Sequence, residues 1–275
     1  MKKVPAGSTV TSIERALTIL ELLSQSKMGH TNAEISRKLK LSKSTASYIL
    51  RTLQHRGYLH RDDDLGKYRI SAKLFSIGSQ PLRDLELHDV ASPVLQDLVD
   101  KTDLTGHLAI LDGREAVYIE KVDKPGFIRM NTWVGRRLDV HCTAVGKALT
   151  AYLPQEAVDE IIRHKGLSKH TPKTITSLNH LLRELAKVRA NGYALDDAEN
   201  NLDVVCIAAP IFNLEGRAVA AVGLTGTESQ MRSHKFESYV KLIKHAAKQI
   251  SHQLGHVGPG HHSGPLEQSP EHRPG

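Results

Sequence analysis

Apolar residues in the first third of the chain recur at the spacing of a helix that is buried on one side. In residues 41–61 (LSKSTASYILRTLQHRGYLHR) they follow the positions i, i+3, i+4 and i+7: Ala46, Ile49, Leu50 and Leu53. Ser42 is the expected N-cap of this helix, and Gly57 fits the position just after its C-terminal end. The pattern predicts a helix that packs along one face and leaves a polar face outside.

Two more helices are predicted before this one. The segment SIERALTILELLS starts at Ser12, the expected N-cap, and its apolar face holds Ile13, Ala16, Leu17, Leu20 and Leu23. The segment TNAEISRKLK opens with a capping box formed by Thr31 and Glu34. Only residues 39–41 (LKL) separate it from the third helix. Such a short turn between two short helices is typical of a helix-turn-helix.

A hairpin is predicted directly after the third helix. The segment YLHRDDDLGKYRI has the pattern of two short strands around an Asp-Leu-Gly turn. A hairpin in this place is the wing of a winged helix-turn-helix domain. In such domains the third helix enters the major groove of DNA, and the wing lies against the backbone or the minor groove.

The charge of the chain is concentrated in this first third. The formal net charge is +7. Residues 1–78 hold 14 Lys/Arg and 6 Asp/Glu, a net charge of +8, whereas residues 79–275 hold 23 and 24, a net charge of −1. No acidic residue occurs in residues 41–61. An ordinary solvated face mixes both signs, so this asymmetry indicates a polyanionic partner.

We therefore expect the N-terminal domain to bind double-stranded DNA rather than to serve protein contacts alone. Long cationic side chains can contact phosphates, which supply most of the affinity: Lys43, Arg51, Arg61, Lys67 and Arg69. Short or planar side chains can reach base edges from a helix in the groove: Ser44, Ser47 and Tyr48. Backbone N–H groups at helix starts can also bind a phosphate, which adds Thr31, Ser42 and Thr45.

The rest of the chain mixes strand and helix patterns. Residues 106–122 (GHLAILDGREAVYIEKV) predict two strands around an Asp-Gly turn. Further strands are expected over 127–131, 193–196, 204–212 and 217–226. Helices are expected over 143–153, 154–164, 177–192 and 234–254. This mixture predicts an α+β domain with a mainly antiparallel sheet and helices against it.

These patterns also divide the chain. We expect a winged helix-turn-helix domain over 1–70, a helical linker over 71–88 that Gly78 and Pro81 interrupt, a second domain over 89–256 and a disordered Gly- and Pro-rich tail over 257–275. The second domain should open with a helix near Asp89. Two cysteines form no disulfide framework, and neither a signal peptide nor an apolar run of membrane-spanning length is present. A cytoplasmic protein without a membrane partner is therefore expected.

The segment RRLDVHCTAVGKA is the candidate small-molecule site. It leads a strand into a helix whose expected N-cap is Thr143, so the N–H groups of residues 143–145 would face an anion. Ala144 and Gly146 would leave room for a ligand beside the backbone. The alternative is close packing of this helix on the sheet.

The chain resembles the IclR family of bacterial transcriptional regulators from Ser12 to Leu254. The N-terminal blocks that carry the resemblance are SIERALTILELL, LSKSTASYILRTLQHRGY and GKYRIS. The C-terminal blocks are VGRRLDVHCTAVGKALTAYLP, GYALDDAENNLDVVCIAAPI and GRAVAAVGLTG, and their order is highly specific. Lys40 stands at the helix-turn-helix turn where the family usually has glycine.

The resemblance implies a C-terminal effector domain similar to GAF and PAS-like sensor domains. In the family, small organic acids are held by backbone groups at a helix start, by an acidic residue of the DDAE block and by the cysteine of CIAAP. Carried over to this chain, the implied effector residues are His141, Ala144, Val145, Asp196, Val204, Cys206, Gly223 and Thr225.

The expected function is a sequence-specific transcriptional regulator, a repressor by family habit, controlled by a small carboxylate or sugar acid of a catabolic pathway. A homodimer or homotetramer should bind a near-palindromic operator. We expect no cofactor, no metal and no enzymatic activity. The alternatives are a redox sensor that uses Cys142 and Cys206, a thiol-dependent enzyme with His141, and a zinc site of these three residues, whose spacing matches no common zinc pattern.

Overall fold

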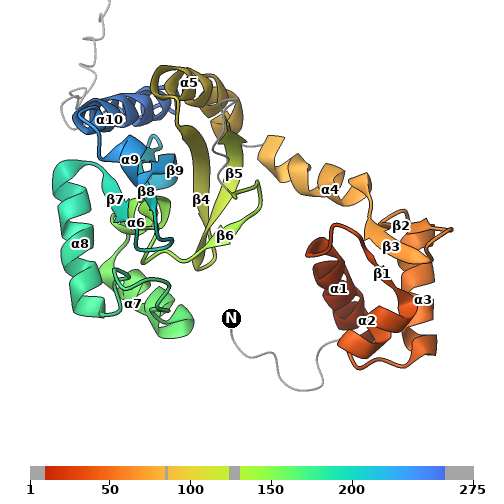
Figure 1. Ribbon diagram of the computed structural model, residues 1–275. Helices are drawn as coiled ribbons and strands as arrows, with labels where there is room; N and C mark the ends of the chain where they lie inside the picture. Colours follow the sequence, from red (N-terminus) through yellow and green to blue (C-terminus); the bar gives the residue numbers. More distant parts are fainter. Residues whose placement is uncertain (1–9, 84–85, 124–130, 258–275) are drawn as a thin grey trace, which may run out of the picture. The chain divides into compact units, whose positions relative to one another are not determined.

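The computed structural model describes residues 10–83, 86–123 and 131–257 (Figure 1). Its contacts divide the chain into two compact units, with the division between Asp84 and Leu85. Residues of the predicted linker over 71–88 therefore fall on both sides of the division. The predicted tail over 257–275 lies, from residue 258 on, outside the described residues.

The N-terminal unit is a winged helix-turn-helix, as predicted. Its helices are α1 (Thr11–Ser24), α2 (Asn32–Lys38) and α3 (Lys43–His55). The wing strands β2 (Leu59–Asp62) and β3 (Lys67–Ile70) pair antiparallel, and the short β1 (His30–Thr31), which the sequence did not indicate, joins the other edge of β3. The core of this unit is formed by Ile19, Leu23, Ile35, Leu50, Leu59 and Tyr68.

The first helix differs from its prediction in start and orientation. It begins at Thr11, and Val10 occupies the N-cap without a side-chain hydrogen bond, so Ser12 is not the cap. Ile13 and Leu17 of the predicted buried face are 57% and 54% exposed. Leu23 of the predicted face is in the core and Leu20 packs against it, so the C-terminal half of the prediction is confirmed, and Ile19 joins them from outside the predicted face. Periodicity could not distinguish between these overlapping faces.

The connection between the units is more helical than predicted. Helix α4 (Ala72–Arg83) continues through Gly78 and Pro81, which we expected to interrupt it. A glycine costs a helix only about 1 kcal/mol, and Pro81, in the last turn, removes only one of the final backbone hydrogen bonds of the helix. Helix α5 (Glu86–Thr102) begins before Asp89, because Leu87 is buried and extends the apolar face by one turn.

One six-stranded antiparallel sheet forms the centre of the C-terminal unit, in the order β6-β5-β4-β9-β8-β7. The strands are β4 (Thr105–Asp112), β5 (Glu115–Val122), β6 (Arg137–Leu138), β7 (Ala194–Asp197), β8 (Val204–Phe212) and β9 (Ala218–Thr227). The α+β prediction is therefore confirmed. The two-residue β6 was not predicted, and the candidate strand over 127–131 lies, except for Asn131, outside the described residues.

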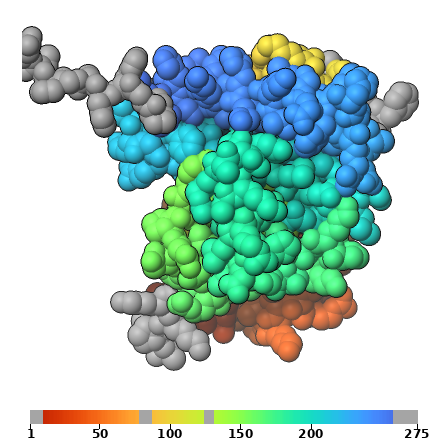
Figure 2. All heavy atoms as spheres, turned by 90° about the vertical axis from the view of Figure 1, so that its left-hand side faces the viewer, coloured from red at the N-terminus to blue at the C-terminus, as the bar shows by residue number. Residues whose placement is uncertain are grey.

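Helices cover both faces of this sheet (Figure 1). Helix α6 (Ala144–Thr150) packs on β8 and β9 from one side, next to α8 (Leu178–Asn191), with α7 (Gln155–Lys165) between them in the chain. The long α10 (Phe236–Gln253) and α5 pack together against the other side, and the short α9 (Glu228–Met231) precedes α10. Figure 2 shows α8 and α10 at the outer surface of this unit. No helix in the described part of the chain is long and apolar enough to cross a membrane.

Candidate nucleic-acid interface and buried polar site

Helix α3 is held by its apolar stripe and presents polar side chains on the outside. The predicted N-cap is confirmed, since the Ser42 hydroxyl accepts a hydrogen bond from Thr45 N at 3.1 Å. Ala46 and Leu50 are fully buried. The candidate contact residues Lys43, Ser44, Tyr48 and Arg51 are exposed, and Thr45 and Ser47 are half-buried. The helix thus directs the predicted contact residues away from its own core.

Tyr48 and Arg51 form the most prominent pair on this outer face. Tyr48 is 68% exposed, and the Arg51 guanidinium lies 4.9 Å from the centre of its ring. A cation over an aromatic face is attracted to it, and residues i and i+3 are neighbours on a helix. Within the described residues neither Lys43 nor Arg51 forms an ion pair with an acidic side chain. Both charges are therefore available to an external anion.

The turn between α2 and α3 positions the start of α3. Lys40 adopts φ of 53°, the left-handed conformation for which glycine is usual. The predicted capping box of α2 is present: Glu34 N donates to the Thr31 hydroxyl, and Thr31 N donates to Glu34 Oε2. Thr31 thus serves first as a structural cap. Asn32 Nδ2 donates to Lys43 O at 3.2 Å and ties the two helix starts together.

The wing supplies cations with acidic neighbours. Arg61 Nη1 lies 3.8 Å from Asp63 Oδ1, and Arg69 Nη2 lies 3.5 Å from Asp62 Oδ2. Lys67 stands opposite Asp62 in the β2–β3 register. These partly exposed pairs are weak, so the cations can exchange partners. Because Asp62 and Asp63 lie beside these cations, the wing is less positively charged than the outer face of α3.

In the C-terminal unit, three of the candidate effector residues lie side by side on the sheet face that α6 covers. Asp196 on β7 stands opposite Cys206 on β8, which stands opposite Thr225 on β9. Opposed residues of antiparallel strands project to the same face. The Thr225 hydroxyl donates to Cys206 Sγ at 3.3 Å. The three residues are far apart in the sequence, and only the register of the three strands brings them side by side.

His107 extends the row and was not indicated by the sequence. Its Nδ1 lies 3.4 Å from Thr225 Oγ1, its Nε2 lies 2.8 Å from Thr132 Oγ1, and its ring stacks on Tyr118 at 4.2 Å between centroids. Burial lowers the pKa of His107 to about 3, so the imidazole is neutral at pH 7. The only signal in the sequence was a histidine inside a strongly apolar strand.

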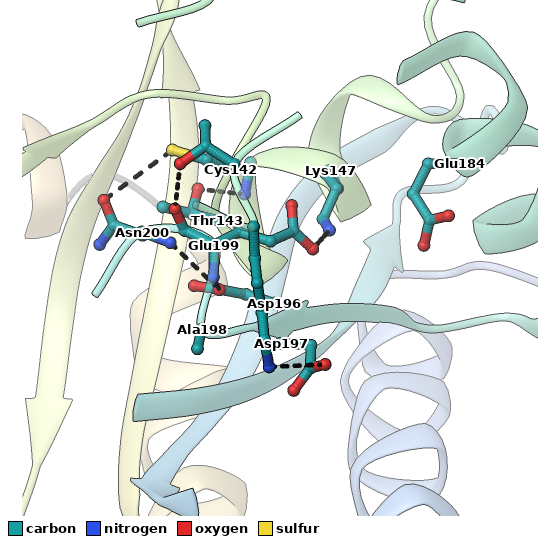
Figure 3. Close-up of polar contacts among 12 residues, drawn as sticks. Cys142, Thr143, Lys147, Glu184, Asp196, Asp197, Ala198, Glu199 and Asn200 are labelled. Atoms are coloured by element: carbon teal, nitrogen blue, oxygen red, sulfur yellow. Dashed lines mark hydrogen bonds and ion pairs between the residues drawn. The ribbon is translucent and has the colours of Figure 1, made fainter. Parts of the chain in front are cut away.

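Asp196 is a buried carboxyl group at the other end of the row (Figure 3). Its Oδ1 accepts hydrogen bonds from Glu199 N at 2.8 Å and Asn200 N at 3.4 Å. Burial raises the pKa of Asp196 to about 7 in spite of these bonds and of the nearby Lys147. The group therefore titrates near neutral pH.

A buried ion pair stands beside Asp196. Lys147 Nζ donates to Glu199 Oε1 at 2.5 Å, and Lys147 has no exposed surface (Figure 3). Burial raises the pKa of Glu199, and the ammonium of Lys147 opposes that shift. Lys147 belongs to α6, so the pair fixes this helix against the segment after β7. Neither residue was singled out from the sequence.

Close packing governs the start of α6. Thr143 is its N-cap, as predicted, and accepts from Gly146 N at 3.2 Å. A Cβ at position 146 would lie 2.4 Å from Val140 Cα, and one at position 223 would lie 3.0 Å from Val145 Cγ1. We expected Gly146 to leave room for a ligand, and this expectation was wrong: the glycine allows the backbone to approach its own preceding segment.

The remaining candidates lie around this face. Ala144 and Val145 are buried in the first turn of α6. Val204 is half-buried at the start of β8, opposite Thr227. The imidazole of His141 is buried and contacts Ser168 O at 3.0 Å through Nε2, so this ring faces the loop between α7 and α8.

The two cysteines are free and poorly suited to thiolate chemistry. Burial raises the pKa of both Cys142 and Cys206. A reactive thiol needs a lowered pKa and access to solvent; Cys142 is fully buried, and Cys206 is half-buried with a raised pKa. The metal-ligating side chains that the described residues bring together are His141, Cys142 and His170 rather than the set with Cys206.

Comparisons with known proteins cover nearly the whole chain. Residues 12–63 match the family model of the IclR helix-turn-helix domain, and residues 79–252 match that of the bacterial transcriptional regulator IclR C-terminal domain. The HTH-type transcriptional regulator XynR of Escherichia coli (strain K12) is 36% identical over 247 residues, 90% of this chain and 98% of that protein. The transcriptional repressor IclR of the same strain is 31% identical over 253 residues, 91% of this chain and 92% of that protein.

Solved structures share the architecture. The crystal structure of an IclR homolog complexed with 4-hydroxybenzoate, from Microbacterium hydrocarbonoxydans, matches with a TM-score of 0.78 and 27% sequence identity. The match covers 89% of this chain and 99% of that chain. Both units of the fold are therefore those of known transcriptional regulators.

Proposed function

Because the chain belongs to the IclR family of bacterial transcriptional regulators, we propose that it is a repressor whose affinity for its operator is controlled by a small carboxylate effector. The DNA-binding unit is a winged helix-turn-helix of the family. The observation that carries the proposal is the exposed, acid-free outer face of α3. A repressor function follows the name of the Escherichia coli relative.

On DNA, α3 lies in the major groove and the wing follows the backbone. Lys43, Arg51, Arg61, Lys67 and Arg69 contact phosphates, with backbone support from Thr31, Ser42 and Thr45. Ser44, Ser47 and Tyr48 read base edges. The exposure of Lys43, Ser44, Tyr48 and Arg51 supports this division. The wing cations add affinity only after leaving Asp62 and Asp63.

The protein acts as a homodimer or homotetramer on a near-palindromic operator. A two-fold assembly places its recognition helices in half-sites about one helical turn, roughly 34 Å, or a multiple of it apart. The effector changes operator affinity by binding better to one of two states of this assembly.

The effector is a small organic acid, a hydroxy acid or a sugar acid, bound at the row of Asp196, Cys206 and Thr225. Its other contacts are His141, Ala144, Val145, Val204 and Gly223. Three side chains in register on one sheet face support the site: Asp196 and Thr225 are buried and Cys206 between them is half-buried. The aromatic carboxylate in the solved homolog supports the chemical class. At pH near 7, protonated Asp196 donates a hydrogen bond to the effector.

Catalysis and redox sensing are disfavoured by the same geometry. Both thiols are held in the protonated form by burial, which opposes a nucleophilic or readily oxidised thiolate. The regulators that match the chain support a binding protein rather than an enzyme.

A thermal-shift screen against sugar acids, hydroxy acids, keto acids and 4-hydroxybenzoate tests the proposal. A ligand of the native state raises the melting temperature by mass action. We expect at least one carboxylate to do so and to change operator affinity in a binding assay. Thr225→Val should reduce the shift, whereas Thr102→Val, an equally buried threonine on α5, should not. Stabilisation by uncharged compounds alone would overturn the effector class.

A further inference from the structure

We propose that His141, Cys142 and His170 form a binding site for Zn²⁺ in front of helix α6. One ligand atom from each side chain, an imidazole nitrogen or the thiol sulfur, lies within 4.8 Å of the other two. His141 and Cys142 are 2% and 0% exposed, and His170 closes the cluster from the exposed side. The cluster shares His141 with the proposed effector contacts, whereas Cys142 and His170 lie outside the row of Asp196, Cys206 and Thr225.

The hydrogen bond of His141 leaves its Nδ1 for the metal. Nε2 lies 3.0 Å from Ser168 O, and a carbonyl oxygen only accepts hydrogen bonds. Nε2 therefore carries the hydrogen, and Nδ1 of the neutral ring carries a lone pair. A backbone carbonyl behind the second nitrogen is a usual partner of a metal-binding histidine.

His170 is oriented in the same way by a carboxylate. Its Nε2 lies 2.9 Å from Asp139 Oδ2, which accepts the hydrogen and leaves Nδ1 as the lone-pair donor. The backbone of Asp139 is itself held, because its carbonyl oxygen accepts from the Thr143 hydroxyl at 2.7 Å. A carboxylate, a histidine and a metal in series is a common arrangement around zinc.

Cys142 completes a nitrogen and sulfur ligand set. Its Sγ lies 3.8 Å from Asn200 Oδ1, a weak contact (Figure 3). Among the described residues no hydrogen bond joins His141, Cys142 and His170 to one another, although one ligand atom of each lies within 4.8 Å of the other two. Two imidazoles and one thiolate suit Zn²⁺ and leave a fourth position for water.

The ion would connect two segments that are far apart in the sequence. His141 and Cys142 lie between β6 and α6, and His170 lies in the loop between α7 and α8. Binding replaces the thiol proton, which is released to solvent as the sulfur–metal bond forms. The loop around His170 would thus be held against the start of α6.

Titration of the full-length protein with Co²⁺ tests the site, because a cobalt–thiolate bond produces a near-ultraviolet charge-transfer absorption. We expect this band to saturate at one Co²⁺ per chain and to disappear when Zn²⁺ is added. Cys142→Ser should abolish the band, and the matched variant Cys206→Ser should keep it. The histidines of the C-terminal tail, such as His261 and His262, can bind cobalt but cannot produce a thiolate band.

Two further variants separate a metal site from a role in folding. His170→Ala should weaken Co²⁺ binding at least about tenfold, and Asp139→Asn should weaken it about 10–100-fold. His180→Ala, an exposed histidine on α8, is the matched control and should have no effect. The proposal would be overturned by the absence of the band in the folded wild-type protein, by a band that depends on Cys206, or by equal binding in the His170 and His180 variants.

Discussion

Lys147 and Glu199 form an ion pair that is buried between α6 and the segment after β7. Lys147 Nζ lies 2.5 Å from Glu199 Oε1, and the side chain of Lys147 is 0% exposed. Glu199 Oε2 is buried without a hydrogen-bond partner among the described residues. The hydrogen bond between Lys147 and Glu199 thus replaces only part of the hydration that the two charges lose on burial.

Removing one member of this pair should be far more damaging than removing both. We expect Lys147→Met or Glu199→Leu to lower the free energy of unfolding by about 3–5 kcal/mol, because each leaves an uncompensated buried charge. The double variant should lose less than either single variant, as measured by urea denaturation. Lys101→Met is the control: its pair with Asp97 is more than half exposed and should contribute less than about 1 kcal/mol. Additive losses would contradict the coupling.

Lys43 and Arg51 should set the salt dependence of DNA binding. Lys43→Ala and Arg51→Ala should each weaken binding to operator and random DNA alike, because phosphates are the same in every sequence. The slope of log K against log salt concentration should fall by about 1 for each variant. Fluorescence anisotropy at several salt concentrations measures this slope. The control is Lys248→Ala on the exposed face of α10, which should keep the wild-type slope. A slope in the Lys43 and Arg51 variants equal to that of the control would exclude phosphate contacts.

Ser47 and Tyr48 should set the base preference. Ser47→Ala and Tyr48→Ala should reduce discrimination between operator and random DNA by about 1–3 kcal/mol each. Since Tyr48 also contacts the Arg51 guanidinium, Tyr48→Phe keeps the ring and isolates the hydroxyl. Competition binding assays with both DNAs give the ratio. Parallel losses on both DNAs would show that these residues only position the helix.

Effector affinity should fall as pH rises through the pKa of Asp196. Burial raises this pKa to about 7, so the carboxyl is mostly neutral at pH 6 and mostly ionised at pH 8. An anionic effector prefers the neutral form, and its affinity should drop by about tenfold between these values. Asp196→Asn should remove the dependence.

The neighbouring residue supplies the control for this experiment. Asp197 follows Asp196 on β7, projects to the opposite sheet face and pairs with Lys173 and Arg232. Asp197→Asn should therefore retain the pH dependence of effector binding, which isothermal titration calorimetry measures. A wild-type affinity that does not change with pH would contradict a contact between Asp196 and the effector carboxylate.

His107 should destabilise the fold in acid. Its pKa is lowered from 6.5 to about 3 by burial, so the unfolded chain binds more protons between these values and stability falls as pH decreases below 6.5. The loss amounts to at most about 2.7 kcal/mol between pH 6.5 and 4.5. His107→Gln should lack this contribution. Denaturation of the wild-type protein and of the His107→Gln variant at both pH values isolates the contribution of His107, because Asp196 contributes equally in the two proteins. An identical pH dependence of the two proteins would contradict the lowered pKa of His107.

Much of the fold was predictable because its signals are local. The capping box of Thr31 and Glu34, the N-caps Ser42 and Thr143 and the hairpin after α3 each depend on residues within a few positions of one another. The strand over 204–212 was predicted with its observed bounds. Short elements such as β1, β6 and α9 were missed, since two to four residues carry no periodicity.

The candidate sites divide in the same way. The outer face of α3 could be derived from the sequence, because a helix fixes which of its own residues share a face. The buried row could not: Asp196, Cys206 and Thr225 meet through strand register, and His107 joins them from a strand about a hundred residues earlier. His170 reaches His141 and Cys142 through a loop whose course the sequence did not indicate.

The sequence by itself determined the order and type of the main elements, the basic N-terminal domain and the acid-free recognition helix. Only the tertiary structure decided which face of α1 is buried, that Gly146 permits close packing, and that Lys147 and Glu199 pair inside the C-terminal unit. The reason is physical. Caps, turns and periodicity act between neighbours in the chain, whereas burial, pKa shifts and ligand geometry depend on side chains that only the packing of distant segments brings together.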